Sequence, residues 1–87
     1  ASMIQRGKPD PEIYLMAAQQ LGVSPQQCVV FEDAFSGIEA GLRAGMTVVA
    51  LATTHTREEL LLTGAQLIID DFTQINHRTL VKLTRNR

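Results

Sequence analysis

The sequence predicts an α/β domain built on a doubly wound parallel sheet, and two observations lead to that class. Helical and β-rich segments alternate along the chain, an order typical of parallel strands joined by helices. The other observation is a short apolar run at residues 28–31 that ends in two adjacent acids, Glu32 and Asp33. Because this run is too short and too apolar for a half-exposed strand, we expect a strand buried on both faces, as in the middle of a parallel sheet.

The first helix is expected from Pro11 to just before Gly22. Asp10 is a typical N-cap residue, proline is favoured at the first helical position, and glycine commonly ends a helix in the left-handed conformation. Apolar residues recur at helical spacing and predict one buried face, made of Ile13, Tyr14, Ala17, Ala18 and Leu21.

Two further helical starts are predicted from the spacing of the capping box. Ser24 and Gln27 indicate a single helical turn, and Ser36 with Glu39 indicates the start of a helix over residues 36–44. That helix has a surface of small residues that would let it lie close against a sheet, namely Gly37, Ala40, Gly41 and Ala44.

The remaining elements complete the alternating pattern. We expect a strand at residues 47–51, a short helix at 57–62, a third strand at 67–69 and a last helix in the basic tail from residue 77 to 87. The Asp70–Asp71 pair after the third strand is expected to be a turn or a helix cap.

Size and composition limit the classes of function. A chain of 87 residues makes at most one small domain, and a net charge of −1 gives no general attraction to nucleic acid or membrane. The single cysteine, Cys28, excludes an intrachain disulfide, and its place in an apolar run favours a buried small hydrophobe over a nucleophile. With no signal peptide or long apolar span in the sequence, a cytoplasmic protein is expected.

Glu32 and Asp33 are the strongest candidates for a functional site. Acids at the end of a buried strand lie in the crevice where open α/β sheets bind ligands. Two carboxylates there suit Mg²⁺, which takes one or two protein oxygens together with water and phosphate. The alternative from spacing alone is a solvated acidic turn in which the aspartate caps the next helix.

Several motifs in order along the chain resemble one family. They are G-K-P-D-P at residues 7–11, V-V-F-E-D at 29–33, S-G-I-E-A at 36–40, A-G-M at 44–46 and T-T-H at 53–55. The sequence resembles the haloacid dehalogenase-like (HAD-like) hydrolases, in particular the subgroup of sugar-phosphate phosphatases and β-phosphoglucomutase. The likeness runs from about residue 6 to residue 75.

The resemblance implies a Rossmann-like sheet and a set of roles. Lys8 would stabilise the phosphoryl group and the nucleophile. Asp33 would bind Mg²⁺ directly, while Glu32 would bind it through water or pair with Lys8. The implied substrate is a small phosphorylated metabolite, with a sugar phosphate as the favoured class.

The sequence also departs from the family. It contains no D-x-D motif, from which the family's aspartyl nucleophile comes, so no nucleophile is assigned in this chain. It also lacks the family's first strands and helical cap. We therefore expect residues 1–87 to form one incomplete core domain, the C-terminal half of such an enzyme, inactive alone. The strand at 28–31 would present an open edge, which predicts a homodimer or a strand-swapped assembly.

Other interpretations stay open. The chain could be a non-catalytic α/β module that oligomerises or pairs with another chain. A basic tail without interleaved aromatic residues is most often a solvated helix face, so nucleic acid is not expected as a partner, and neither is a membrane. His55 and His77 are expected to be surface histidines, and Ser36 is expected to be a helix cap.

Overall fold

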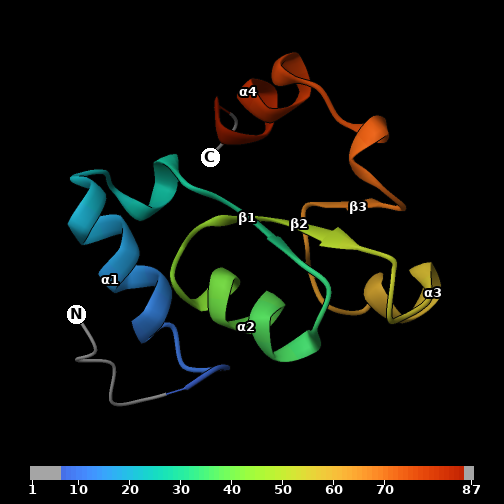
Figure 1. Ribbon diagram of the computed structural model, residues 1–87, viewed down its shortest axis with the longest axis horizontal. Coiled ribbons are helices and arrows are strands. Elements are labelled where there is room, and N and C mark those ends of the chain that lie inside the picture. The colour runs from blue at the N-terminus through green and yellow to red at the C-terminus, as the bar shows by residue number, and fades with distance from the viewer. Residues whose placement is uncertain (1–6, 86–87) are drawn as a thin grey trace.

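The computed structural model describes residues 7–85 and confirms the α/β prediction (Figure 1). Three parallel strands form one sheet in the order β1-β2-β3, with β1 at Val29–Glu32, β2 at Thr47–Leu51 and β3 at Leu67–Ile69. In the register, Val30 pairs with Val48 and Ala50 pairs with Ile68. Parallel pairing of consecutive strands requires a crossover between them, and helices supply both crossovers.

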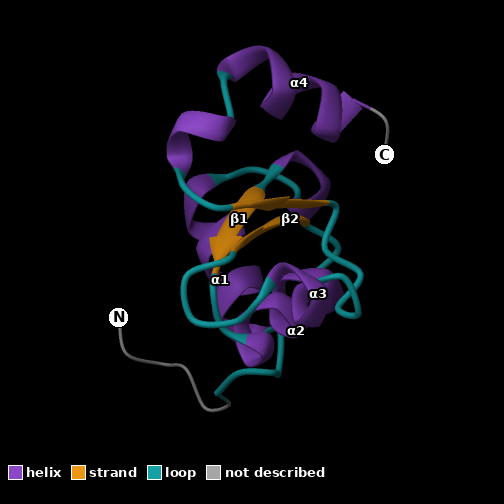
Figure 2. Ribbon diagram, turned by 90° about the vertical axis from the view of Figure 1, so that its right-hand side faces the viewer, coloured by secondary structure: helices purple, strands orange, loops and turns teal. Residues whose placement is uncertain are grey.

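Helices lie on both sides of this sheet (Figure 2). The α-helices are α1 (Glu12–Leu21), α2 (Phe35–Arg43), α3 (Arg57–Leu60) and α4 (His77–Arg85), and the 3₁₀ turns are η1 (Pro25–Gln27) and η2 (Phe72–Gln74). In Figure 2, α2 and α3 lie on one side of the sheet and α4 on the other. Within residues 7–85, none of the helices has the length and apolar character needed to span a bilayer.

α2 lies directly on the sheet, as its small residues predict. Ile38, Ala40 and Gly41 of α2 are buried, and α2 packs against β1 and β2. A Cβ atom added at Gly41 would lie 2.7 Å from Cγ2 of Val48, which is closer than real Cβ contacts. The absence of a side chain at Gly41 therefore sets the distance between helix and sheet.

β2 is the central strand of the described sheet, and β1 is one of its edges. The first four residues of β2 are all buried, whereas Val30 alone of the four residues of β1 is buried. The prediction that residues 28–31 are buried on both faces is wrong for this chain. The strand starts at Val29, and Cys28 before it is half-buried. An apolar run fits an edge as well as a centre, because burial depends on what packs against the strand.

The first helix forms with the predicted end and a start shifted by one residue. Pro11 takes the N-cap position, and Asp10 Oδ1 still accepts a hydrogen bond from the Glu12 N–H at 3.0 Å. Gly22 has φ 72° and ends the helix, as predicted. The predicted apolar face is only partly correct, because Ala18 is buried but Leu21 is 75% exposed. Leu21 lies beside the edge strand β1, where it lines a groove rather than the core.

The predicted cap of the second helix is wrong. α2 begins at Phe35, so Ser36 lies inside the helix, and the N-cap Ala34 has no side-chain cap. Instead, Oε1 of Glu32 accepts hydrogen bonds from the N–H groups of Asp33 and Ala34. A carboxylate from the preceding strand thus accepts hydrogen bonds from free backbone N–H groups at the helix N-terminus. In a capping box the N-cap side chain would accept such a bond.

The other predicted elements are present. The turn at η1 has the Gln27 side chain accepting from the Ser24 N–H at 3.0 Å, as the spacing predicts. α3 ends at Leu60, two residues earlier than expected. Asp71 caps η2 by accepting from the Thr73 N–H at 2.8 Å, which confirms the prediction of a cap. The tail helix is confirmed as α4 as far as Arg85, and its predicted end at residues 86–87 lies outside the described residues.

Candidate functional site

Glu32 and Asp33 lie at the carboxyl end of the sheet. Glu32 is the last residue of β1, and Asp33 begins the short loop to α2. Thr53 and Thr54 follow the end of the neighbouring strand β2, and their hydroxyls reach Asp33. The loops after two parallel strands thus meet at the edge where open α/β sheets bind ligands.

Four donors surround the carboxylate of Glu32, whose side chain is only 14% exposed. Oε1 lies 3.2 Å from the nitrogen of Asp33 and 3.3 Å from that of Ala34. Oε2 lies 2.8 Å from Oη of Tyr14 and 3.2 Å from Nζ of Lys8. A carboxylate has about four acceptor positions, so the protein itself fills those of Glu32.

Lys8 reaches the site from the loop before α1, where it is joined to Pro9 by a cis peptide bond. Its ammonium forms an ion pair with Glu32 and lies 5.5 Å from the centroid of the Tyr14 ring. The Lys8 side chain is 36% exposed, so the ammonium is held on one side and open to solvent on another. Of the two arrangements considered for Glu32, the structure contains the pairing with Lys8.

Gly37 makes room for Glu32 in the first turn of α2. A Cβ atom built at Gly37 would overlap Cγ, Cδ and Oε2 of the Glu32 side chain. The Glu32 side chain therefore lies directly over the backbone of the helix. Glycine is required here for the close approach, not for a special backbone angle, because the φ of Gly37 is not positive.

Asp33 differs from Glu32 in the donors around it. Its Oδ2 lies 3.2 Å from Oγ1 of Thr53 and 3.4 Å from Oγ1 of Thr54, and within residues 7–85 its hydrogen bonds reach Oδ2 alone. The side-chain groups that meet here are a carboxylate and two hydroxyls. Their oxygen atoms are the ligand type that a hard cation such as Mg²⁺ prefers. No group of three or more His, Cys, Asp and Glu side chains in the described part of the chain is arranged to hold a metal.

The contacts at Glu32 shift three pKa values. Burial raises the pKa of the Glu32 carboxyl, but the hydrogen bonds from Tyr14, Lys8 and the Ala34 N–H outweigh it, so the pKa lies below its ordinary value of 4.5. The hydrogen bond to Glu32 raises the pKa of Lys8 above 10.5, against the lowering effect of burial. Burial, followed by the contact with Glu32, raises the pKa of Tyr14 above 10.0. Around neutral pH the cluster is a carboxylate, an ammonium and a neutral phenol.

The lowered pKa of Glu32 predicts a specific loss of stability in acid. A group whose pKa is lower in the folded state stabilises the fold above its unfolded pKa, and this contribution disappears as pH falls through the folded pKa. The free energy of unfolding should therefore decrease as the pH is lowered below 4.5, which is the ordinary pKa of a glutamate such as Glu32. Urea unfolding between about pH 7 and about pH 3 measures this, and Glu32→Gln should show a shallower decline than the unmodified chain. An equal pH dependence of the free energy of unfolding in the two proteins would contradict a lowered pKa of Glu32 in the folded state.

The other sequence candidates lie outside this cluster. His55 stacks on Phe35 with ring centroids 3.9 Å apart, and His77 is exposed at the start of α4. Asp70 pairs with Arg57 at 3.4 Å. Sγ of Cys28 contacts the Ser24 carbonyl oxygen at 3.5 Å.

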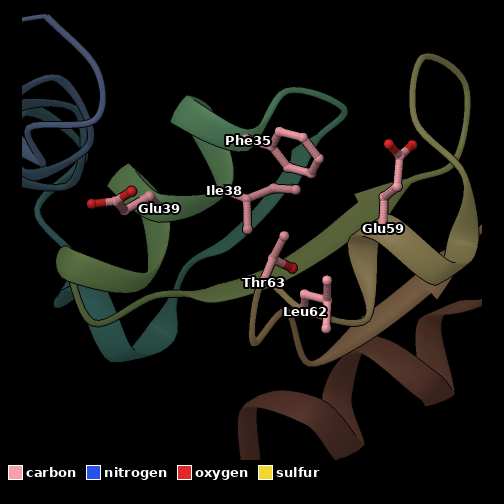
Figure 3. Close-up of a pocket in the computed structure, with 6 residues that line it drawn as sticks. All are labelled: Phe35, Ile38, Glu39, Glu59, Leu62 and Thr63. Carbon is pink, nitrogen blue, oxygen red and sulfur yellow. The ribbon is translucent and has the colours of Figure 1, made fainter.

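A groove of about 560 Å³ between α2 and the segment after α3 also lies apart from Lys8 and Glu32 (Figure 3). It is lined by Phe35, Ile38, Glu39, Glu59, Leu62 and Thr63.

Four residues that contact Glu32 or Asp33 are not predicted as site residues from the sequence. The sequence pattern places Tyr14 only on an apolar helix face and Gly37 only on a surface of small residues. Thr53 and Thr54 belong to a motif that by itself predicts no role for them. One signal was available for Tyr14, because a tyrosine on a buried face needs a partner for its hydroxyl, and the nearby motifs supplied an acid.

Comparison with known proteins agrees with the fold. The sequence profile of the haloacid dehalogenase-like hydrolases matches residues 1–45, more than half of the chain. The chain is similar to validoxylamine A 7'-phosphate phosphatase from Streptomyces hygroscopicus subsp. limoneus, with 47% identity over 75 residues, which are 86% of this chain and 34% of that protein.

Two solved structures share nearly the whole fold. A HAD hydrolase of family IA, variant 3, from Entamoeba histolytica superimposes with a TM-score of 0.90 at 43% identity, covering 98% of this chain and 39% of that one. A β-phosphoglucomutase from Clostridium difficile superimposes with a TM-score of 0.82 at 34% identity, covering 99% and 36%. The chain thus spans about a third of the length of each of these three proteins, and it belongs to the haloacid dehalogenase-like hydrolases.

Proposed function

We propose that this chain carries one half of an active site for Mg²⁺-dependent hydrolysis or transfer of a phosphoryl group on a small sugar phosphate. Lys8, Glu32 and Asp33 are its share of that site. The substrate class is supported by the similarity to validoxylamine A 7'-phosphate phosphatase and to a β-phosphoglucomutase. A cytoplasmic location stays a prediction.

One observation carries the proposal. The ion pair between Lys8 and Glu32 holds a cationic group at the carboxyl edge of the sheet, where Asp33 follows Glu32 in the chain. Glu32 is saturated by protein donors, whereas Asp33 is held by two hydroxyls on one oxygen. An ammonium and an adjacent carboxylate available to a cation are the groups that neutralise charge in phosphoryl transfer.

The residues of this chain would divide the work as follows. Lys8 donates hydrogen bonds to phosphoryl oxygens, and Glu32 keeps the Lys8 ammonium oriented. Asp33, steadied by Thr53 and Thr54, supplies the carboxylate oxygen for Mg²⁺, which when bound neutralises negative charge on the phosphoryl group. Because the sequence contains no D-x-D motif, we place the nucleophile of the proposed reaction on a segment outside these residues.

Complementation tests this proposal. The 87-residue chain is mixed with a separately produced piece of the Streptomyces phosphatase, namely the part that this chain does not match. We expect Mg²⁺-dependent hydrolysis of a generic aryl phosphate from the mixture and none from either piece alone. Asp33→Asn should lower the rate of the mixture by about 100-fold or more, because a charge-stabilising group is lost.

The control is Asp71→Asn, the same replacement at an exposed cap where asparagine serves equally well. It should leave the rate of the mixture unchanged. Turnover by this chain alone, lost in Asp33→Asn, would contradict the half-site and require a nucleophile among the present residues. A fully assembled but inactive mixture would contradict the enzymatic proposal.

A second candidate is a module that associates with another chain through β1. Among the described strands β1 pairs on one side only, with β2. A groove of about 510 Å³ lies beside this strand, and its lining includes the apolar residues Ala18 and Leu21 of α1 and Val29 and Phe31 of β1. We propose a second copy as the occupant in the absence of a complementing chain, since an open edge with an apolar groove favours strand pairing.

A further inference from the structure

Tyr14 touches both charged groups of the cluster although it comes from a different element. It lies in α1, whereas Lys8 precedes that helix and Glu32 ends β1. Its hydroxyl donates to Oε2 of Glu32 at 2.8 Å, and its ring centroid is 5.5 Å from Nζ of Lys8. The side chain is half-buried, so these contacts are partly shielded from water.

The two contacts act on different parts of the ion pair. The hydroxyl shares with Lys8 the oxygen Oε2, while the backbone donors of Asp33 and Ala34 fill Oε1. The ring face attracts the ammonium by a cation–π interaction. Without the hydroxyl, the side-chain donor remaining on Oε2 is a partly exposed lysine with four rotatable bonds in its stem.

We propose that Tyr14 is a positioning residue of this site, which holds the Glu32 carboxylate facing Lys8 and so fixes the direction of the Lys8 ammonium. This inference rests on the proposed function for its biological meaning. Tyr14 itself touches no reacting atom. It acts through Glu32, and by filling Oε2 it leaves Asp33 as the carboxylate available to a cation.

A purely structural tyrosine would behave differently. If Tyr14 only packs and satisfies its own hydroxyl, removing that hydroxyl changes stability and leaves the environment of Lys8 as it was. If Tyr14 positions Glu32, removing the hydroxyl lets the carboxylate swing toward solvent and makes the ion pair with Lys8 intermittent. The exposure of the Lys8 amine to a reagent distinguishes these outcomes.

The test is brief acetylation of the folded 87-residue chain, read residue by residue by mass spectrometry. The sequence contains two lysines, and Lys82 on the exposed side of α4 serves as the internal reference. In the unmodified chain Lys8 should react more slowly than Lys82. Tyr14→Phe should raise the ratio of the Lys8 rate to the Lys82 rate by about threefold, and Glu32→Gln should raise it further, since a charge-assisted hydrogen bond is lost completely.

An unchanged ratio in Tyr14→Phe together with a raised ratio in Glu32→Gln would overturn the inference. A second measurement needs no variant: in the unmodified chain, nuclear Overhauser contacts are expected between the Tyr14 ring and the Cε protons of Lys8, and their absence would overturn it as well. Neither readout uses metal, substrate or turnover. Failure of the complementation experiment therefore leaves this test intact, and the reverse also holds.

Discussion

Replacing Gly37 with alanine is expected to destabilise the fold by about 1–3 kcal/mol and to break the ion pair between Lys8 and Glu32. In an ordinary helix the same change stabilises by about 1 kcal/mol, because alanine is the better helix former. The sign reverses here because the added Cβ overlaps the side chain of Glu32. Glu32 can relieve the overlap by swinging outward, but it then loses its four hydrogen bonds.

Urea unfolding of a double-mutant cycle measures the effect. In a Glu32→Ala background the Cγ, Cδ and Oε2 atoms that the new Cβ would overlap are absent, so Gly37→Ala should now stabilise by about 1 kcal/mol. Ser36→Ala, one residue earlier, should change the free energy of unfolding by less than about 0.5 kcal/mol, because Ser36 lies exposed inside the helix and does not cap it. Stabilisation by Gly37→Ala in the unmodified background would refute the close packing of Glu32 on α2.

Two copies of the chain are expected to associate through their β1 edges, and Val29→Pro should raise the dissociation constant by at least about tenfold. The Cys28 carbonyl accepts from the Thr47 N–H of β2. Because backbone groups alternate in direction along a parallel strand, those of Val29 point to the open edge and those of Val30 point to β2. Proline at 29 removes a donor from the edge and leaves the pairing with β2 intact.

Sedimentation over a range of concentrations measures the association, and circular dichroism reports the fold. Val30→Pro is the matched control. It removes a hydrogen-bond donor to β2 and should therefore unfold the chain or strongly destabilise it. The complementing piece that restores turnover should also dissolve the dimer, since both occupy the same edge of β1. A strictly monomeric chain at high concentration would show that the edge is not an interface between copies.

The order of the elements and the place of the two acids follow from local sequence patterns. The alternation of helices and strands, the stop at Gly22 and the position of Glu32 and Asp33 at the end of β1 are local properties, set by periodicity and by the few residues that end an element. The motif around Lys8 likewise named a residue that the fold brings to Glu32. The first three predictions were correct because they depend on neighbours in the chain, whereas Lys8 was named through a family motif and meets Glu32 across 24 residues.

The difference between the two acids, and the groups that surround each of them, depend on contacts between distant parts of the chain. Ser36 has the spacing of a cap, yet a carboxylate from the preceding strand satisfies the helix entrance. Tyr14 is separated from Glu32 by 18 residues, and its hydroxyl selects one oxygen of that carboxylate. The burial of β1 likewise depends on which strands and helices flank it. Contacts of this kind join side chains that are distant in sequence, and their energy depends on packing geometry that no local pattern encodes.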